Sequence, residues 1–332
     1  MDKINVAVIG CGGFARGMHL PNLRKNSSYR IYAVVDIDES LAKKVAQEYG
    51  AIYFTSYDKV LEDNKVNLVL ITTRHNLHSE MTIKAARAHK HILCEKPMGL
   101  NYKECKEVIA AVKNNGVKYT IGYNRGLAPL VTKAFALLKD NPYPKVIYHR
   151  MQNFSPYGAH WLHDEKIGGG RVIGEGCHVL DLACVLTGTR PIRIYAEGGI
   201  LSCPGKEGVP DSSVITIGFD DGSIAALLLS SVGHGGIAKE VTEVYCHKTA
   251  IIVDNFQSFR AYGFGDPIEE KLAEGDKGHQ IELHLLAEAI LKDEESPNDL
   301  ASALRAALLS FKVNEAIKTG KVQYINPKEL EV

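Results

Sequence analysis

Short hydrophobic runs alternate with helix-length amphipathic segments through about the first 120 residues of the chain. The runs are four to six residues long and apolar at nearly every position, as strands buried on both faces of a sheet are. Strands that alternate with helices indicate a parallel sheet with right-handed crossovers, so we expect a doubly wound α/β domain. The expected strands are residues 5–9, 31–36, 67–72, 91–94 and 118–122, and the expected helices are residues 15–25, 39–49, 57–63, 78–88 and 102–114.

A different pattern follows, in which strand-like segments outnumber helices. Asp220-Asp221-Gly222 joins two such segments and is a good hairpin signal. A run of strands followed by helices indicates an α+β domain with a largely antiparallel, open sheet. The expected strands include residues 145–152, 214–219, 223–229 and 322–325, and the expected helices are residues 128–138, 279–292 and 297–319, with a further helix opened by the glycine-rich stretch 167–176.

The length of the chain agrees with this change of pattern. It has 332 residues, and single hydrophobic cores rarely grow beyond about 250–300 residues. We therefore expect two domains, residues 1–123 and residues 124–332. The 39 basic and 39 acidic residues give a net charge of zero, which provides no overall electrostatic attraction to nucleic acid or to an anionic membrane surface.

Cysteine usage and the N-terminus both favour a cytoplasmic protein. The seven cysteines are an odd number without a C-x-x-C pair, which indicates reduced thiols rather than a disulfide framework. The sequence enters its first strand without the features of a signal peptide, and no stretch approaches 18 uninterrupted apolar residues. We expect neither a membrane nor a nucleic acid as a partner.

A glycine-rich turn follows the first expected strand and opens a helix. Gly10-Cys11-Gly12-Gly13-Phe14-Ala15 has the G-x-G-x-x-A form of a dinucleotide-binding fingerprint. The first glycine allows the tight turn, the second lets a pyrophosphate approach the backbone, and the small third residue lets the helix pack closely on the strand. Gly10, Gly12, Gly13, Phe14 and Ala15 are the expected contacts, and an ordinary glycine turn is the alternative.

An aspartate ends the second expected strand, as the fingerprint requires. Asp36 lies 21 residues after Ala15, where a carboxylate can accept hydrogen bonds from the ribose hydroxyls. The same charge would repel a 2′-phosphate, and no arginine follows at once, since the next residues are Ile37 and Asp38. The sequence therefore predicts NAD rather than NADP as cofactor, the alternative role of Asp36 being a helix cap.

Glu95-Lys96-Pro97 after the fourth expected strand resembles a motif of the glucose–fructose oxidoreductase and inositol dehydrogenase family, known as Gfo/Idh/MocA. The other matching segments occur in the family's order along nearly the whole chain. The resemblance implies a Rossmann domain followed by an open-sheet α+β domain, and activity on a sugar or polyol. The segments are Ile71-Thr72-Thr73 with His78, Gly122-Tyr123-Asn124-Arg125, Gly168-Gly169-Gly170 with His178 and Asp181, Lys277-Gly278-His279, and Ser296-Pro297.

The resemblance also implies roles for individual residues. His178 falls on the family's catalytic histidine, and Lys96 falls on the lysine that contacts the substrate hydroxyl and the nicotinamide ribose. Without the resemblance, a helix-start histidine and a surface cation would be the simpler interpretations. The further expected cofactor contacts are Thr73, Arg74, His78 and Glu95, and the further expected substrate contacts are Tyr123, Arg125, His160, Trp161 and Glu175. No metal is expected, because family members generally use none.

Two departures from the family pattern concern the expected site. Thr73-Arg74-His75 lacks the proline that usually follows the threonine. Gly174 stands where the family has an aspartate four residues before the histidine, and Glu175 is its neighbour. Glu175 replaces the missing carboxylate only if the backbone turns its side chain inward, because adjacent residues on a helix point about 100° apart.

The sequence thus predicts an NAD-dependent dehydrogenase or reductase that acts on a hydroxyl of a sugar, sugar derivative or polyol. Two alternatives stay open at this point. One is an enzyme that uses transient oxidation by bound NAD to drive an elimination or a glycosidic cleavage, and the other is a non-catalytic dinucleotide-binding regulator. By resemblance, we also expect a homodimer or homotetramer formed through the exposed sheet face of the second domain.

Overall fold

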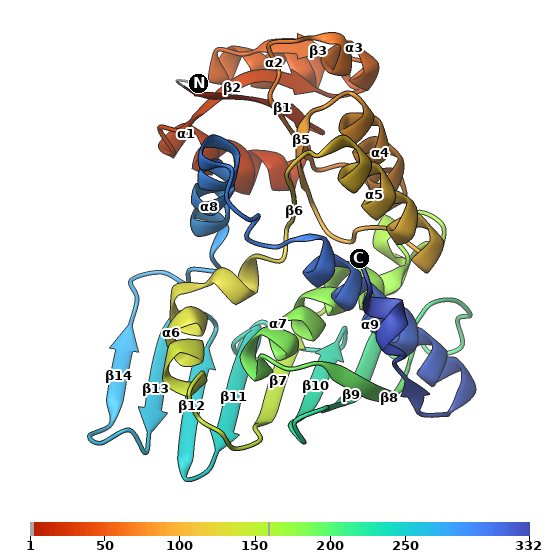
Figure 1. Ribbon diagram of the computed structural model, residues 1–332. Helices are drawn as coiled ribbons and strands as arrows, with labels where there is room; N and C mark the ends of the chain where they lie inside the picture. Colours follow the sequence, from red (N-terminus) through yellow and green to blue (C-terminus); the bar gives the residue numbers. More distant parts are fainter. Residues whose placement is uncertain (1–2, 159) are drawn as a thin grey trace. The chain divides into compact units, whose positions relative to one another are not determined.

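The computed structural model describes residues 3–158 and 160–332, and the chain divides into two compact units (Figure 1). The first unit takes the chain as far as Tyr123 together with His279–Leu304 and Val332. The second unit consists of Asn124–Gly278 and Arg305–Glu331. Each unit is built around a sheet of its own.

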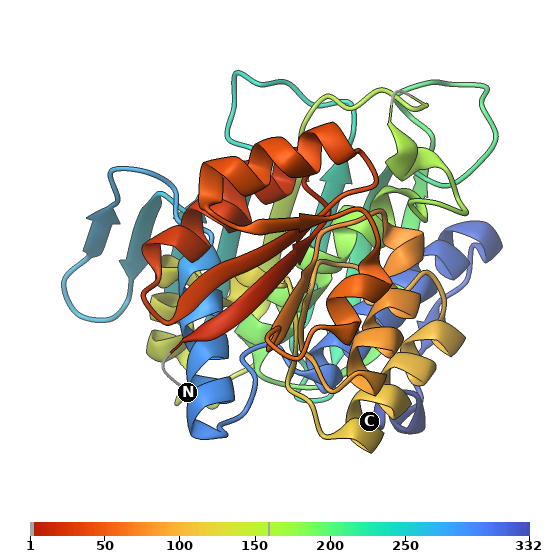
Figure 2. The ribbon, with the colours of Figure 1, turned by 90° about the horizontal axis from the view of Figure 1, so that it is seen from above.

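The first unit contains a six-stranded sheet in which every neighbouring pair is parallel. The strand order is β3-β2-β1-β4-β5-β6, so the chain runs outward from β1 in one direction and then restarts beside it in the other. Helices lie along both sides of the sheet (Figure 2), which confirms the expected doubly wound domain. The strands are β1 (Ile4–Ile9), β2 (Tyr29–Val35), β3 (Ile52–Phe54), β4 (Leu68–Ile71), β5 (His91–Cys94) and β6 (Tyr119–Ile121).

Side-chain caps fix where two of the helices in this unit begin. Asp38 accepts a hydrogen bond from the backbone N–H of Leu41, and Asn101 accepts one from Glu104. The first helix differs from the expected single α-helix, because its opening turn has the wider π-helical hydrogen bonding. The helices are η1 (Ala15–His19), α1 (Leu20–Lys25), α2 (Glu39–Tyr49), α3 (Tyr57–Glu62), η2 (His75–Leu77), α4 (His78–Arg87) and α5 (Tyr102–Asn115).

Helix α8 (His279–Lys292) returns to the first unit after all strands of the second sheet except β15. Leu283, Leu286 and Ala287 join the buried cluster around β1, and the Tyr29 hydroxyl donates a hydrogen bond to the Leu283 carbonyl at 2.6 Å. A division of the chain at residue 123 does not anticipate this return, because an amphipathic helix does not reveal which sheet it will cover.

The second unit contains a nine-stranded sheet with the order β14-β13-β12-β11-β7-β10-β9-β8-β15. β7 and β10 are parallel and the other pairs are antiparallel, as expected for a largely antiparallel sheet. The strands are β7 (Val146–Gln152), β8 (Pro191–Gly199), β9 (Ser212–Phe219), β10 (Ile224–Ser230), β11 (Glu240–Cys246), β12 (Thr249–Asp254), β13 (Ser258–Tyr262), β14 (Ile268–Lys271) and β15 (Gln323–Tyr324).

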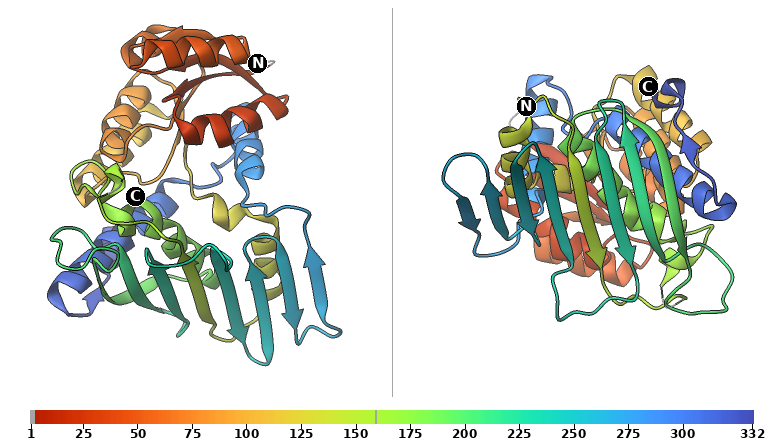
Figure 3. Two further views of the ribbon diagram at one scale, coloured as in Figure 1. Left: turned by 180° about the vertical axis from the view of Figure 1, so that it is seen from behind. Right: turned by 90° about the horizontal axis from the view of Figure 1, so that it is seen from below.

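Within the described residues of the second unit, helices cover one face of this sheet and leave the other face bare (Figure 3). Ile317 of α9 packs against Gly198 of β8, and α6 and α7 pack beside it on the same face. The helices of the unit are η3 (Asn124–Leu127), α6 (Pro129–Leu138), η4 (Trp161–His163), η5 (Val172–Gly176), α7 (Cys177–Thr187), the greater part of α9 (Leu300–Thr319) and η6 (Pro327–Leu330). No described helix is long and apolar enough to cross a membrane.

Candidate active site

The glycine turn after β1 has the backbone shape and the open space that a dinucleotide requires. Gly10 has a φ of +94°, and a Cβ there would lie 2.9 Å from the Thr72 carbonyl oxygen, so a side chain is excluded on both grounds. The Thr72 hydroxyl donates a hydrogen bond to the Gly10 carbonyl at 2.8 Å. No heavy atom lies within 4 Å of a Cβ built on Gly12 or Gly13, which leaves their backbone open to a pyrophosphate.

Phe14 and Ala15 begin the helix that follows this turn. Ala15 is buried in the core of the first unit, where its small side chain lets the helix lie close to the sheet. Phe14 is half exposed, and its ring makes edge contacts with the rings of His19 and His279 at centroid distances of 5.1 and 6.2 Å. Within the fingerprint, the backbone of Gly12 and Gly13 therefore faces open space, whereas the side chains of Phe14 and Ala15 pack against neighbouring residues.

Asp36 brings a carboxylate to the same turn. One of its oxygens accepts a hydrogen bond from the Cys11 backbone N–H at 2.7 Å, and the other accepts one from the Asp38 N–H at 3.0 Å. The carboxylate is partly exposed beside the glycine turn. This position suits hydrogen bonds to the ribose hydroxyls of NAD, and its negative charge opposes a 2′-phosphate.

Glu95 forms a buried ion pair at the end of β5. Its Oε1 lies 2.8 Å from His19 Nε2, and its Oε2 accepts a hydrogen bond from the Lys96 N–H at 3.3 Å. Burial raises the pKa of Glu95, but the hydrogen bond and charge of His19 outweigh burial, so the net shift is downward. Gly122 packs directly on this carboxylate, and the next residue, Tyr123, is fully buried. The partly exposed Lys96 thus follows a rigid, charged support.

His78 connects two segments that leave the carboxyl edge of the parallel sheet. Its Nδ1 lies 2.9 Å from the Pro97 carbonyl oxygen and its Nε2 lies 3.2 Å from the Thr73 carbonyl oxygen. Burial lowers the pKa of His78. Arg74, by contrast, is exposed at this edge. His78 therefore orders the turns that carry Thr73 and Lys96, and its direct contact with the cofactor stays a prediction.

His178 lies in the first turn of α7, directly after the π-helical segment η5. The glycine-rich run before it is explained by close packing. A Cβ on Gly168 would lie 2.4 Å from backbone atoms of Leu162, and one on Gly170, whose φ is +82°, would lie 2.6 Å from the Val209 side chain. The backbone thus approaches its neighbours closely and delivers His178 to a buried position.

Glu175 is paired with a buried arginine from its own helical segment. Arg171 Nη2 lies 3.2 Å from Glu175 Oε2, and the two side chains are 1% and 30% exposed. Arg171 also donates to the Ser231 hydroxyl at 2.6 Å and to the Asn153 side-chain oxygen. The Glu175 carboxylate, next to Gly174, is therefore held by the Arg171 guanidinium, whose own position is fixed by its other hydrogen bonds.

Arg125 takes part in a second buried network. Its Nε and Nη2 donate to the two oxygens of Glu240 at 2.7 and 2.9 Å, and Lys277 Nζ lies 2.6 Å from Glu240 Oε1. His149 Nδ1 lies 2.8 Å from the Thr242 hydroxyl, and burial lowers the pKa of His149 to about 4, so the ring is neutral. The Arg125 guanidinium is occupied by this bidentate pair, and its contact with substrate stays a prediction.

The two expected aromatic contacts lie at η4. The rings of His160 and Trp161 are 4.9 Å apart and tilted, and His160 Nδ1 caps the turn by accepting from the Leu162 N–H at 3.2 Å. His163 is buried, stacks on Tyr157 at 4.9 Å and accepts from the Gly158 N–H at 2.9 Å. Within residues 3–158 and 160–332, no three His, Cys, Asp or Glu side chains gather as metal ligands would.

Four partners of these residues are not predicted by the sequence patterns: His19, Arg171, Glu240 and Arg305. Arg305 Nη2 lies 3.5 Å from Asp181 Oδ1 and provides a counter-charge for that carboxylate. His19 and Glu95 are 76 residues apart, and Arg125 and Glu240 are 115 apart. Of these four partners, only His19 could have been suspected from the sequence, because it is a polar residue one helical turn after the apolar Ala15.

The parallel sheet, the open glycine turn and the Asp36 carboxylate define a dinucleotide-binding oxidoreductase fold. Comparison with known families agrees. Residues 4–123 match the family model described as "Oxidoreductase family, NAD-binding Rossmann fold", and residues 143–252 match the GFO/IDH/MocA C-terminal domain. The chain belongs to the Gfo/Idh/MocA family of NAD-binding oxidoreductases, as its motifs predict.

Several relatives and solved structures resemble the chain over most of its length. The scyllo-inositol 2-dehydrogenase (NAD(+)) of Bacillus subtilis is 30% identical over 240 residues, which are 70% of this chain and 69% of that protein. The myo-inositol 2-dehydrogenase of Thermotoga maritima is 26% identical over 76% of this chain and 75% of its own. The aldose-aldose oxidoreductase of Caulobacter crescentus, solved with glycerol, has a TM-score of 0.88 at 24% identity, covers 97% of this chain and 100% of its own, and shows the same fold.

Proposed function

We propose that this protein transfers a hydride between NAD and a hydroxyl-bearing carbon of a sugar or polyol. The observation that carries the proposal is that both motif residues are present beside ordered segments. Lys96 follows Glu95, which is paired with His19, and His178 lies at the start of α7. The relatives named as inositol dehydrogenases support a substrate with several hydroxyl groups.

The proposed residues divide the chemistry between binding the cofactor and moving the proton. Bound NAD supplies the hydride acceptor, and the residues proposed to hold it are the glycine turn, Asp36, Thr73, Arg74, His78 and Glu95. The imidazole of His178 accepts the proton of the reacting hydroxyl as the hydride leaves the carbon. The ammonium of Lys96 stabilises the negative charge that develops on that oxygen. In the reducing direction His178 returns the proton.

The remaining proposed contacts select the substrate. The tilted ring pair of His160 and Trp161 offers an aromatic surface against which C–H groups of a sugar or polyol pack. Glu175 offers a partly exposed carboxylate that accepts hydrogen bonds from hydroxyl groups. Tyr123 and Arg125 are buried, so we assign them to the frame of the substrate site.

A substrate panel tests this function directly. The protein is mixed with NAD or NADP and with myo-inositol, scyllo-inositol, aldoses, uronates or nucleotide sugars, and the absorbance of reduced cofactor is followed. We expect steady formation of NADH with at least one neutral polyol or sugar and slower turnover with NADP. If a panel compound is consumed without net NADH formation, the chemistry is instead the elimination or cleavage through transient oxidation. If no compound is converted, the proposal is overturned.

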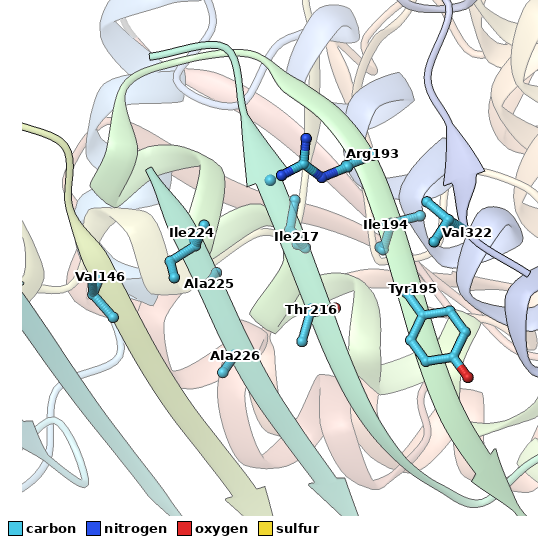
Figure 4. A pocket seen from close by; sticks show the side chains of 11 residues that line it. Val146, Arg193, Ile194, Tyr195, Thr216, Ile217, Ile224, Ala225, Ala226 and Val322 are labelled. Carbon is cyan, nitrogen blue, oxygen red and sulfur yellow. The ribbon is translucent and has the colours of Figure 1, made fainter. Parts of the chain in front are cut away.

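We also propose that two copies of the chain associate through the bare face of the nine-stranded sheet. Outward-pointing side chains of β7–β10 line a shallow apolar hollow on this face (Figure 4). Val214 and Ile224, on neighbouring strands, are 53% and 48% exposed. Exposed apolar side chains of this kind favour association, and a net charge of zero does not oppose it.

A further inference from the structure

A buried arginine, Arg171, pairs with Glu175. Glu175 follows Gly174, the position at which the family has an aspartate. Arg171 is 1% exposed, and a guanidinium that is shielded from water needs both hydrogen-bond acceptors and a counter-charge. The Ser231 hydroxyl and the Asn153 side chain provide two neutral acceptors. Glu175 forms an ion pair with Arg171, and the charge of Asp211 also acts on the guanidinium.

The neutral partners of Arg171 are themselves fixed at the ends of strands. Ser231 follows β10, and its hydroxyl donates to the Asp211 carbonyl at 2.7 Å. Asn153 follows β7, the central strand that pairs with β10. The guanidinium is thus anchored to the middle of the sheet, and its position does not depend on Glu175 alone.

The carboxylate of the pair, unlike the guanidinium, reaches open space. The Glu175 side chain is 30% exposed, and it precedes His178 by three residues on a continuous helical path through η5 and α7. Glu175 therefore lies about one helical turn before His178 along the chain, with its carboxylate partly exposed.

A second buried cation also acts on Glu175. The charge of Glu175 stabilises the charged form of Arg125, whose own bidentate partner is Glu240. Burial lowers the pKa of Arg171, and the charge of Glu175 opposes that shift. The Glu175 carboxylate therefore interacts with two buried guanidinium groups, those of Arg171 and Arg125.

We propose that Arg171 is a positioning residue that holds Glu175 as an ionised hydrogen-bond acceptor for a hydroxyl neighbouring the one that reacts. This inference rests on the proposed function. It makes Glu175 the replacement for the carboxylate absent at Gly174, and it makes a second hydroxyl beside the reacting carbon a feature of the substrate.

The test compares wild type with Arg171→Lys, Arg171→Met, Glu175→Gln and the double variant Arg171→Met/Glu175→Gln. The substrate is the panel compound that wild type oxidises fastest. We expect each single change to lower kcat/KM for that compound about 10- to 100-fold, the range for loss of a hydrogen bond to a charged group, while the KM for NAD changes little. The double variant should be no worse than Arg171→Met, because both changes remove the same interaction.

The pH profile separates positioning from mere structural support. With Arg171→Met, Glu175 loses the counter-charge of Arg171 and keeps only that of Arg125, so a new acidic limb of kcat/KM should appear as the carboxylate takes up a proton. The double variant lacks that carboxyl group, and its profile should lose the limb. A general loosening of the fold would not produce a limb that disappears with Glu175.

Matched controls keep the interpretation definite. Arg190→Met removes an exposed arginine whose partner Asp220 lies 3.3 Å away, and it should leave the kinetics unchanged. Thermal unfolding shows whether Arg171→Met folds. If it does not, the test is made with Arg171→Lys, which retains the buried positive charge, and with Glu175→Gln, which retains the Arg171 side chain. Unchanged kcat/KM in Glu175→Gln, or multiplicative losses in the double variant, would overturn the inference. Absence of any turnover by wild type would instead overturn the proposed function on which it rests.

Discussion

We assign the choice of cofactor to a single carboxylate. Asp36 lies beside the glycine turn with its oxygens on the N–H groups of Cys11 and Asp38. We expect Asp36→Ser to raise the KM for NAD about 10- to 100-fold, because a hydrogen bond to a charged group contributes about 1.5–3 kcal/mol. The preference for NAD over NADP should fall at the same time, since the repulsion of a 2′-phosphate is removed. Initial rates with each cofactor measure both effects.

The matched control for this change is Asp58→Ser, which alters an exposed carboxylate of the same unit whose Lys84 partner lies 3.8 Å away. It should leave both KM values unchanged. A variant at Asp36 that keeps the wild-type KM for NAD would contradict the assignment of Asp36 to the ribose.

Lys96 is the residue at which charge stabilisation can be measured most directly. Removing one electrostatic donor from a site of this kind costs about 2.7–4 kcal/mol in the transition state, so Lys96→Met should lower kcat about 10²- to 10³-fold. NADH binding, followed by its fluorescence, should persist because the glycine turn and Asp36 are untouched. Lys103→Met is the control, since the Lys103 side chain is 86% exposed. Undiminished turnover of the Lys96 variant would show that this lysine has no catalytic role.

At the scale of elements, Glu240 at the start of β11 joins the two ends of the segment Asn124–Gly278. It binds Arg125 in η3 and Lys277 just before α8, and it is 1% exposed. Glu240→Gln leaves two cations without a counter-charge, and breaking a buried pair in this way costs about 3–5 kcal/mol. We expect a corresponding loss in the free energy of unfolding measured with urea. Glu243→Gln, on the same strand and only partly buried, should cost far less.

The same pair predicts a pH dependence of stability. Burial raises the pKa of Glu240, but the charges of Arg125 and Lys277 prevail and hold it well below its usual 4.5. A carboxyl whose pKa is depressed by folding stabilises the fold above its unfolded pKa and loses that contribution as the pH falls. The wild type should therefore lose more stability below about pH 4.5 than Glu240→Gln does. Parallel losses in the two proteins would contradict this account.

Elements with a strong periodic pattern could be predicted from the sequence, and weakly patterned ones could not. The strand of residues 91–94 and the helix of residues 279–292 occur with the predicted limits. β3 (Ile52–Phe54) was missed because it has three residues, two of them exposed, and therefore presents no buried run. The π-helical opening at Ala15–His19 was missed because its apolar spacing does not differ from that of an α-helix over five residues.

The candidate site could be predicted only as far as short motifs reach. The glycine turn, Asp36 and Lys96 each belong to a local pattern whose neighbours explain it. Their supports are pairs of residues distant in sequence, such as Glu95 with His19, 76 residues apart, and only folding brings them together. Arg171 lies four residues from Glu175, yet no pattern distinguishes a buried guanidinium from a solvated one. Site residues that belong to short motifs can therefore be predicted from the sequence, whereas the ion-pair partners that hold them in place cannot.

At the scale of the whole molecule, the bare sheet face predicts how copies of the chain associate. Val214 of β9 and Ile224 of β10 alternate with buried residues along their strands and are about half exposed. In a two-fold interface each residue occurs twice, so Val214→Glu or Ile224→Glu would bury two added charges. Charges without partners in an interface cost several kcal/mol, and association should weaken at least about 100-fold. Sedimentation velocity over a range of concentrations should show wild type as a dimer or tetramer and each variant as a monomer.

The control for this prediction is Leu291→Glu, which adds the same charge at a side chain of α8 that is 41% exposed. It should sediment like wild type, because its element belongs to the first unit and is not part of the nine-stranded sheet. The NADH affinity of all three variants should match that of wild type, since the glycine turn is built within a single chain. A wild type that sediments as one chain at every concentration would exclude the bare face as an interface between copies. A variant at Val214 that stays assembled would place the interface elsewhere on the molecule.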